Sequence, residues 1–381
     1  MKTIELFSGA GGMALGLNQA GFESTAFFEW NMQACQALRH NRPAWHIVNS
    51  DVRHVDFTEF QGVDLVAGGP PCQPFSMGGK ARGYDDTRDM FPQAVRAVRE
   101  IQPSAFLFEN VRGLMRPGFS NYVEFIRLQL TYPDFPVSQN VDWETNLHRL
   151  QAHHSSERRT DGLTYQVSIH QADAADYGVP QRRHRVFFIG FRSDLAVGWS
   201  FPKPTHSQDA LIRTQFVDGS YCDHHGIAPL EPTPRLMKRV ERVRNPDFLD
   251  TTLPWRTVRD AFRDLPDPRT QKDIPNHVYQ PGARTYPGHT GSLLDEPSKA
   301  LKAGDHGVPG GENMLRYPNG KVRYFTVRES ARIQTFPDDF IFPGSWTESM
   351  RQLGNAVPVE LARVVAASIA AKIPAFLAKK A

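Results

Sequence analysis

Short apolar segments alternate with amphipathic segments along the first half of the chain. The apolar segments of strand length are residues 4–7, 25–28, 63–67, 105–108 and 186–190. Helical periodicity lies between several of them, at residues 12–20, 31–40 and 93–101. Because strands that alternate with helices form sheets with helices on both faces, the pattern predicts an α/β fold with a doubly wound, mostly parallel sheet.

The pattern changes twice after this region. Residues 131–164 are polar and contain several histidines, which predicts a surface elaboration. From 193 to 325 prolines are dense and basic residues recur without strong periodicity, which predicts a separate, smaller, loop-rich domain. Residues 326–381 return to a helical pattern. We therefore predict one domain from residues 1–192 plus 326–381, and a second from 193–325.

Composition narrows the class of protein. Of the 381 residues, 40% are hydrophobic and 11% aromatic, as in ordinary globular proteins. No apolar run approaches the roughly 20 residues that a membrane-spanning helix needs, and we expect no signal peptide because residues 3–7 have the pattern of a strand. Three cysteines are too few for a disulfide framework or a cysteine-based zinc site. A net charge of +3 permits a polyanionic partner without requiring one. We expect a cytoplasmic protein.

A glycine-rich segment follows the first predicted strand and opens a helix. It comprises Phe7, Ser8, Gly9, Ala10, Gly11 and Gly12. Its small residues would let a ligand approach the helix N-terminus, although such turns also occur for packing alone. Glu29 follows the strand at 25–28, and Asp51 follows a short apolar segment at 47–48 that would be a third strand; carboxylates in these positions accept hydrogen bonds from ribose hydroxyls. Trp30 offers a flat face to an adenine or a sulfonium, or is a packing aromatic. These residues predict a nucleoside-bearing cofactor. They do not separate NAD from S-adenosylmethionine, although the glycine spacing departs from G-x-G-x-x-G.

Two side chains at strand ends suggest covalent chemistry. After the strand at 63–67, glycines and prolines hold Cys72 on a stiff turn, which makes it a candidate nucleophile. Glu109 ends the strand at 105–108 and is either exposed or partly desolvated; desolvation would raise its pKa and let it donate a proton. On an extended chain Gln181, Arg183 and Arg185 share one face, so some of them could point into the same cleft.

Six segments, in this order, resemble motifs of the cytosine-C5 DNA methyltransferase family of bacterial restriction-modification systems. They are residues 7–12, 70–73, 109–111, 181–185, 328–332 and 354–358, with a long variable region between the fourth and the fifth. The resemblance implies a class I, Rossmann-like methyltransferase fold with S-adenosylmethionine as the cofactor. It also implies DNA (cytosine-5-)-methyltransferase activity, with residues 193–325 as the target-recognition domain.

The resemblance further implies a mechanism. The Cys72 thiolate would attack C6 of a flipped-out cytosine, so that C5 becomes nucleophilic enough to accept the methyl group. Glu109 would hydrogen-bond N3 and the exocyclic amine, Arg185 would hold O2, and Arg183 would support the loop. The base that removes the C5 proton is not identified, and no metal is needed.

Binding residues follow from the same resemblance. For the cofactor they are Phe7, Ser8, Gly9, Gly11, Gly12, Glu29, Trp30, Asp51, Val52, Pro71 and Asn355. For DNA they are Gln73, Ser76, Arg88, Lys299 and Lys302. The chain departs from the family at Ala300, where many relatives have threonine, so a contact to the DNA backbone is in doubt. Lys299, Lys302 and His306 either compensate for it or form a solvated turn.

Double-stranded DNA is the expected partner of a monomeric, nucleoid-associated enzyme, and a cognate restriction endonuclease would be a separate protein. One alternative is a tRNA cytosine-C5 methyltransferase. Another is a catalytically silent DNA-binding regulator, against which the presence of Cys72 and Glu109 argues. An NAD oxidoreductase would leave Cys72 and residues 181–185 without a role. The DNA sequence that is recognised depends on loop geometry and is not legible in the chain.

Overall fold

The computed structural model describes residues 1–71, 89–138, 140–157, 162–245, 247–270, 273–303 and 313–373, in two compact units. The first comprises Met1–Ala172, His184–Phe201 and Ala362–Ala381, and the second comprises Asp173–Arg183 and Pro202–Leu361. Residues 326–361 therefore pack with the second unit. The division of function between 1–192 plus 326–381 and 193–325 stays a prediction.

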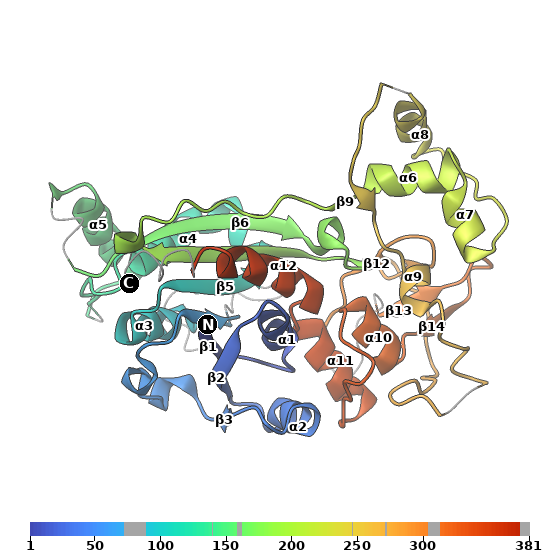
Figure 1. Ribbon diagram of the computed structural model, residues 1–381. Coiled ribbons are helices and arrows are strands. Elements are labelled where there is room, and N and C mark those ends of the chain that lie inside the picture. The colour runs from blue at the N-terminus through green and yellow to red at the C-terminus, as the bar shows by residue number, and fades with distance from the viewer. Residues whose placement is uncertain are drawn as a thin grey trace. The chain divides into compact units, whose positions relative to one another are not determined.

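A seven-stranded sheet forms the centre of the first unit, in the order β3-β2-β1-β4-β5-β8-β6 (Figure 1). The strands are β1 (Lys2–Leu6), β2 (Glu23–Glu29), β3 (Ile47–Asn49), β4 (Leu65–Gly68), β5 (Ala105–Val111), β6 (Tyr165–Asp173) and β8 (His184–Arg192). Strands β1 to β5 pair in parallel, whereas β8 runs antiparallel to β5. The doubly wound, mostly parallel sheet that the sequence predicts is confirmed.

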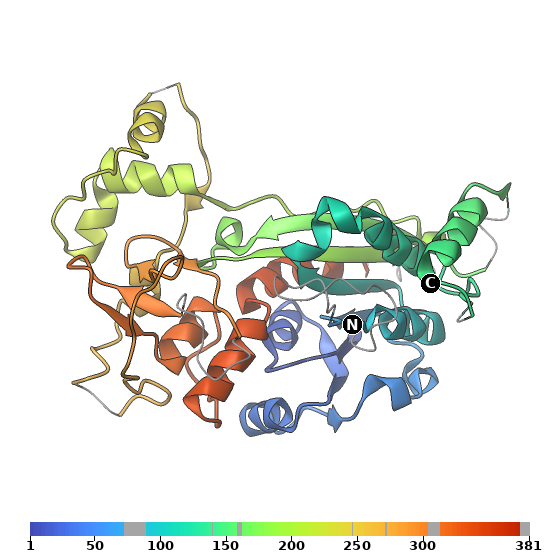
Figure 2. The same cartoon turned by 180° about the vertical axis from the view of Figure 1, so that it is seen from behind.

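Helices cover both faces of this sheet (Figures 1 and 2). Successive strand side chains point to opposite faces, so adjacent residues of β2 serve different layers. Phe27 packs with side chains of α1 (Gly12–Gln19) and α2 (Met32–Asn41). Phe28 joins the larger core, to which α3 (Phe91–Ile101), α4 (Ser120–Thr131) and α5 (Trp143–His154) contribute. The predicted surface elaboration at 131–164 thus contains a helix.

The second unit is more helical than its sequence suggests. Its helices are α6 (Gln208–Phe216), α7 (Ser220–His225), α8 (Met237–Arg244), α9 (Val258–Phe262), α10 (Val327–Ile333) and α11 (Trp346–Asn355), and α12 (Val359–Ala370) passes from this unit into the first. Its strands are short: β7 (Gln181–Arg182), β9 (His206–Ser207), β10 (Leu253–Pro254), β11 (Ser292–Leu293), β12 (Ser298–Lys299), β13 (Met314–Arg316) and β14 (Val322–Tyr324). Small separate cores hold it together, one of them between α6 and α8.

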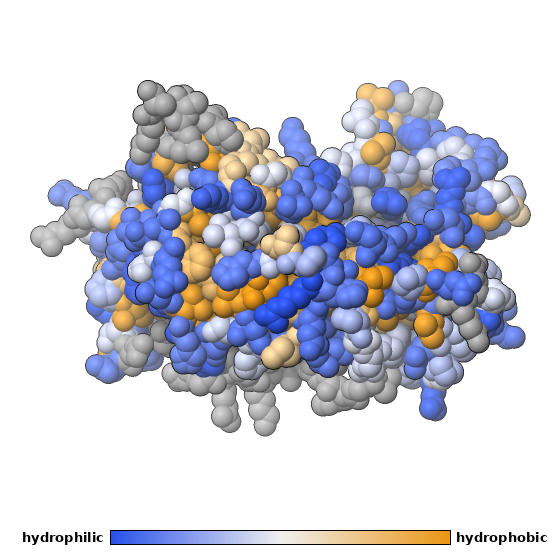
Figure 3. All heavy atoms as spheres, turned by 60° about the horizontal axis from the view of Figure 1, so that its bottom comes forward, coloured by the Kyte–Doolittle hydropathy of each residue, from blue (hydrophilic) through white to orange (hydrophobic). Residues whose placement is uncertain are grey.

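Within the part of the chain that the structure describes, one helical stretch is long and apolar enough to cross a membrane. Its bounds are Trp346–Ala370, which span α11 and α12, and 61% of its most apolar window is buried inside the protein. Burial of this kind is typical of a core helix, so the stretch is weak evidence for a membrane span. Hydrophobic patches on the face shown in Figure 3 are interrupted by hydrophilic residues.

Gly190 sets the fit between the two central strands β5 and β8. It pairs with Phe106 across the strands, and a Cβ at position 190 would lie 2.3 Å from two atoms of the Phe106 ring. We expect Gly190→Ala to lower the free energy of unfolding by about 1–3 kcal/mol, because the buried ring has to shift. Gly198→Ala is the control, since a Cβ there meets nothing within 4 Å. Equal unfolding midpoints of the two variants in denaturant would contradict this.

Candidate active site

The described candidate catalytic residues of the first unit, Glu109 and Arg185, lie at one edge of the sheet. Parallel strands β1, β4 and β5 end at this edge, and the antiparallel strand β8 begins there, with Arg185 opposite Val111. Glu109 is two residues from the end of β5, and Pro71 follows β4 closely. The predicted residues Cys72, Gln73, Ser76 and Arg88 lie outside the described residues. This edge is where doubly wound sheets bind ligands.

Glu109 and Arg185 form a buried ion pair. Nε of Arg185 contacts Oε1 of Glu109, and the exposed fractions of the two side chains are 11% and 9%. Burial lowers the pKa of Arg185 from its ordinary value, while the charge of Glu109 opposes that shift. Gly69 lies beside this carboxyl group, since a Cβ there would be in ordinary van der Waals contact with Oε2 of Glu109, at 3.4 Å. The pair therefore offers a fixed carboxyl and a fixed guanidinium in surroundings where polar contacts are strong.

Hydrogen bonds hold the chain on both sides of residues 72–88. Asn110 Nδ2 donates to the carbonyl of Pro70 (3.0 Å), and the N–H of Met90 donates to the carbonyl of Pro71 (3.1 Å). Asp89 is buried and accepts from the N–H of Phe91 (3.1 Å). The residue that directly precedes Cys72 is thus fixed next to the strand that carries Glu109.

The glycine-rich segment after β1 has an unusual backbone. Phe7, Gly9 and Gly11 all have positive φ, at 58°, 53° and 87°. A Cβ at Gly11 would meet Leu38 at 2.5 Å, whereas one at Gly9 would meet nothing within 4 Å. Gly11 is the N-cap residue directly before α1, and no side chain caps the helix there. Positive φ at a non-glycine residue is costly and concentrates at functional sites, so the segment has the features of a ligand-binding turn with open space at Gly9.

Glu29 ties this turn to the end of β2. Its Oε2 accepts from the N–H of Gly9 (2.8 Å) and its Oε1 from the N–H of Asn31 (2.7 Å). A carboxylate oxygen can accept a second hydrogen bond, so Glu29 keeps capacity for a ligand hydroxyl. Trp30 is 73% exposed, which favours a ligand-facing ring over the alternative of a packing aromatic.

Asp51 and Val52 have other partners. Asp51 accepts from the N–H and the guanidinium of Arg53, and these hydrogen bonds lower the pKa of Asp51. Val52 begins the short turn η1 (Val52–His54), and its side chain is buried in the large core. A ligand hydroxyl would therefore have to share the carboxylate of Asp51 with Arg53.

Sequence reasoning missed Glu5. This residue of β1 is 2% exposed, and its Oε2 makes no hydrogen bond with any described residue. Burial raises the pKa of Glu5 well above its usual value of 4.5, and the nearby charge of Glu29 adds to the shift. The only signal in the sequence is one acidic residue inside an apolar strand, between Ile4 and Leu6.

These features fit S-adenosylmethionine. The buried Glu5 oxygen has no hydrogen-bond donor among the described residues, and the ammonium group of the ligand could supply one. Glu29 can still accept from ribose hydroxyls, a Cβ at Gly9 would meet no described residue within 4 Å, and the ring of Trp30 is exposed. The arrangement can therefore hold a ligand that combines a nucleoside with a cationic amino-acid group.

In the second unit, Arg183 connects two main-chain segments. It is 1% exposed, and its guanidinium donates to the carbonyls of Leu301 (3.0 Å) and Gly354 (2.6 Å). Gln181 is also buried and accepts from the N–H of Leu301 (3.0 Å). Gln181 and Arg183 thus bind main-chain groups of the second unit, whereas Arg185 pairs with Glu109. We predicted that the three side chains share one face, but Arg185 has a different partner from Gln181 and Arg183.

The other predicted residues of the second unit are on its surface or at close contacts. Asn355 is exposed at the end of α11, and Gly354 before it allows a close approach, since a Cβ there would lie 2.3 Å from the nitrogen of Ala303. Lys299 Nζ donates to Thr290 Oγ1 (2.9 Å), and Lys302 is exposed. His306 lies outside the described residues. The roles of Asn355, Lys299 and Lys302 stay predictions.

Glu29→Gln tests the cofactor turn. Glu29 now accepts hydrogen bonds from two backbone N–H groups, and in the variant the amide nitrogen would face one of them. That N–H group would lose its acceptor, and an unpaired buried donor costs about 1–3 kcal/mol. We expect S-adenosylmethionine to bind at least about tenfold more weakly, since tenfold corresponds to about 1.4 kcal/mol. Glu23→Gln, at the exposed start of the same strand, is the control. Equal dissociation constants for the two variants by calorimetry would contradict this role of Glu29.

The raised pKa of Glu5 predicts a pH dependence of stability. Above its usual value of 4.5 the unfolded chain releases the proton that the folded protein keeps, so the free energy of unfolding falls as pH rises through the folded-state pKa. Glu5→Gln removes this titration. Denaturant unfolding without cofactor should therefore give a flatter dependence between pH 5 and 8 for the variant. Parallel curves for the two proteins would show that Glu5 is not the group that titrates.

Comparison with known proteins identifies the family of the chain. Residues 1–142 and 140–371 match the family described as C-5 cytosine-specific DNA methylase. The chain is 34% identical over 374 residues to the Type II methyltransferase M.Eco47II of Escherichia coli, covering 96% of this chain and 78% of that protein. It is 32% identical over 375 residues to M.NgoMIV of Neisseria gonorrhoeae, covering 96% of each.

A solved structure shares the fold. The crystal structure of the S. pombe Dnmt2 methyltransferase superposes with a TM-score of 0.57 at 16% identity, over 97% of this chain and 98% of that one. At this identity the likeness concerns the fold alone. The match to the family covers nearly the whole sequence, and the chain belongs to the family of C-5 cytosine-specific DNA methylases.

Proposed function

We propose that this protein transfers a methyl group from S-adenosylmethionine to C5 of a flipped-out cytosine in double-stranded DNA, within a type II restriction-modification system. The observation that carries the proposal is the buried Glu109–Arg185 pair, at the sheet edge where Pro70 and Pro71 lead into Cys72. Two relatives, M.Eco47II and M.NgoMIV, are named Type II methyltransferases, which supports DNA over tRNA as the substrate.

Cys72 is the proposed nucleophile. Its sulfur forms a bond to C6 of the cytosine, which breaks the C5–C6 double bond and places electron density on C5. The evidence for Cys72 is its place in the chain, directly after Pro71, whose carbonyl is held by Met90. When C5 has been methylated, a base takes its proton and the Cys72 thiolate leaves.

Glu109 and Arg185 would bind the ring during this addition. The carboxyl group of Glu109, sharing a proton with N3 and accepting from the exocyclic amine, draws electrons from the ring and makes C6 easier to attack. Arg185 would donate to O2. Because the ion pair already fixes both side chains, little reorganisation is needed when the base arrives.

The cofactor would supply an electrophilic methyl group on its sulfonium. Glu29 would accept from the ribose, Trp30 would lie against the adenine, and Glu5 would accept from the ammonium group. Phe7, Ser8, Gly9, Gly11, Gly12, Asp51, Val52, Pro71 and Asn355 complete the proposed cofactor site. Arg183 is proposed as a positioning residue, because its guanidinium joins the segments around Leu301 and Gly354.

Residues 193–325 are proposed to recognise the DNA sequence, and the remainder to carry the chemistry. Contacts to the sugar-phosphate backbone and the opened duplex are proposed for Gln73, Ser76, Arg88, Lys299 and Lys302. The enzyme is proposed to act as a monomer in the bacterial cytoplasm, on the nucleoid, with any cognate endonuclease as a separate protein.

DNA that contains 5-fluorocytosine tests the covalent mechanism. Fluorine at C5 cannot leave as a proton, so Cys72 should stay attached to C6 after methyl transfer. Genomic fragments amplified with 5-fluoro-2′-deoxycytidine triphosphate and mixed with radiolabelled S-adenosylmethionine should give an adduct that survives detergent. Cys72→Ser should give none, with less than about a thousandth of the wild-type turnover on ordinary DNA.

The same assay separates the alternatives. Labelled methyl transfer to tRNA but not to genomic DNA would overturn the choice of substrate. No transfer to either, with DNA binding retained, would indicate a silent regulator. Turnover retained by Cys72→Ser would exclude Cys72 as the nucleophile.

A further inference from the structure

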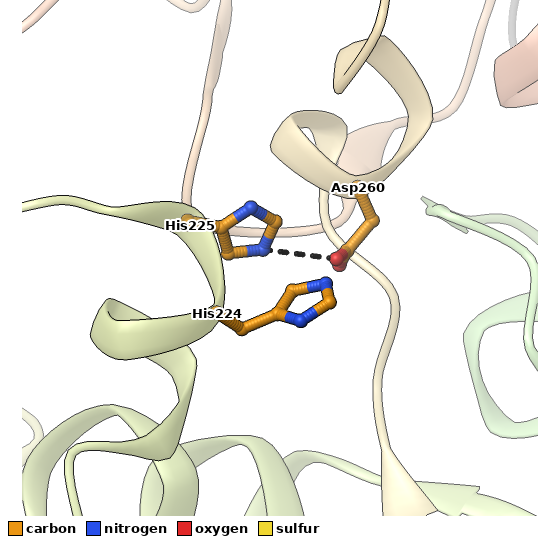
Figure 4. A group of neighbouring side chains, drawn as sticks. All are labelled: His224, His225 and Asp260. Atoms are coloured by element: carbon orange, nitrogen blue, oxygen red, sulfur yellow. Dashed lines mark ion pairs between the residues drawn. The ribbon is translucent and has the colours of Figure 1, made fainter.

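Two histidines and an aspartate converge in the second unit, from segments that are 35 residues apart. His224 and His225 end α7, and Asp260 lies in α9 (Figure 4). One possible ligand atom from each side chain can be chosen so that all three lie within 4.8 Å of one another. Both rings and the carboxylate point toward a common space in Figure 4.

Asp260 is held in position by its own helix. Its Oδ2 accepts from the N–H of Thr257 (2.7 Å) and from Oγ1 of the same residue (2.8 Å), which forms a capping box at the start of α9. Its Oδ1 is turned toward the histidines and lies 3.0 Å from Nε2 of His225. The capping box thus fixes a carboxylate with one oxygen presented to the imidazoles, in the way that outer hydrogen bonds orient metal ligands.

His225 carries a buried nitrogen that is not satisfied by a hydrogen bond. The side chain is 3% exposed, and Tyr221 packs against its ring with centroids 4.5 Å apart. Although Nε2 is 3.0 Å from Oδ1 of Asp260, the contact does not have the geometry of a hydrogen bond, and Nε2 has no hydrogen-bond partner among the described residues. Buried polar atoms of this kind are rare in folded proteins, and an ion that both atoms coordinate would account for it.

His224 is the exposed member of the cluster. Its ring lies edge-on to that of His225, with centroids 4.9 Å apart. Nη1 of Arg263 lies 3.0 Å from Nε2 of His224, so this arginine occupies the nitrogen that a metal would need. Arg263 is exposed and free to turn away. A second nearby cation, Arg259, is neutralised by an ion pair with Asp295 (2.6 Å).

We propose that His224, His225 and Asp260 bind a zinc ion that joins α7 to α9. Imidazole nitrogen and carboxylate oxygen are ordinary zinc ligands, whereas magnesium and calcium prefer oxygen alone. With bonds of about 2.0–2.1 Å, tetrahedral ligand atoms lie about 3.4 Å apart, so small side-chain rotations and the displacement of Arg263 complete the site. Water would take the fourth position, toward a pocket of about 570 Å³ lined by Thr214, Trp255 and Arg256.

This ion would be structural, since the proposed methyl transfer uses no metal. The zinc proposal does not rest on that activity. Zinc binding to the whole chain tests it directly. Cys72→Ser removes a thiol that could bind zinc, and serves as the parent protein after treatment with EDTA and removal of the chelator. Calorimetric titration with zinc chloride should give one site per chain, and zinc should raise the midpoint of thermal unfolding.

Three variants of this parent locate the site. His224→Ala should weaken zinc binding at least tenfold and abolish the thermal shift; because His224 is exposed, its loss leaves the fold intact. Arg263→Gln should strengthen binding severalfold, since it frees Nε2 of His224. His148→Ala is the matched control, because this histidine is exposed on α5 outside the cluster, and it should bind zinc as the parent does.

The proposal is overturned by any of three results. The parent binds no zinc in a one-to-one ratio, His224→Ala binds it as tightly as His148→Ala, or Arg263→Gln binds it no better than the parent. None of these measurements involves methyl transfer, so failure of the zinc site and failure of the proposed enzymatic function are distinguishable.

Discussion

The antiparallel pairing of β5 with β8 is the constraint on which the candidate active site depends. Glu109 stands opposite Phe187, and Arg185 is two residues further along the same face, so the two charged side chains meet diagonally across the strands. A slip of one residue would turn one partner to the other face and separate the pair. The register of β5 against β8 is also constrained nearer the other end of the strands. There Gly190 lies opposite Phe106, and a Cβ at position 190 would overlap the ring of Phe106. Packing in the middle of the sheet thereby positions the chemistry at its edge.

The two halves of this edge differ in how their buried polar groups are satisfied. Glu109 and Arg185 form an ion pair, so the side that is proposed to bind the base is arranged before any substrate arrives. On the side that is proposed to bind the cofactor, Glu5 has a buried oxygen without a hydrogen-bond partner among the described residues, and the positive φ of Phe7 adds backbone strain. Costs of this kind persist where the surrounding fold imposes them and a ligand can relieve them.

Local patterns allowed the sheet to be predicted, but not the second unit. Apolar runs such as 63–67 mark buried strands, whereas β6 was missed because only three of its nine residues are buried. Helices α6 to α8 were missed because they bury few side chains, such as Ile212, Val240 and Val243, among prolines and charges. At the candidate site, the residues that follow the ends of strands could be identified from the sequence. Glu5 was not, because an acidic residue in an apolar strand looks the same whether it faces water or a buried pocket.

Arg183 and Arg185 show the limit of reasoning from a motif. The two arginines are two residues apart, and an extended chain would place them on one face. The chain is not one strand here, because β7 ends at Arg182 and β8 begins at His184. Arg183 therefore turns to the carbonyls of Leu301 and Gly354, while Arg185 turns to Glu109. A motif identifies which residues matter, but the backbone between them decides that one arginine holds main-chain segments together and the other lies beside the carboxyl group at the sheet edge.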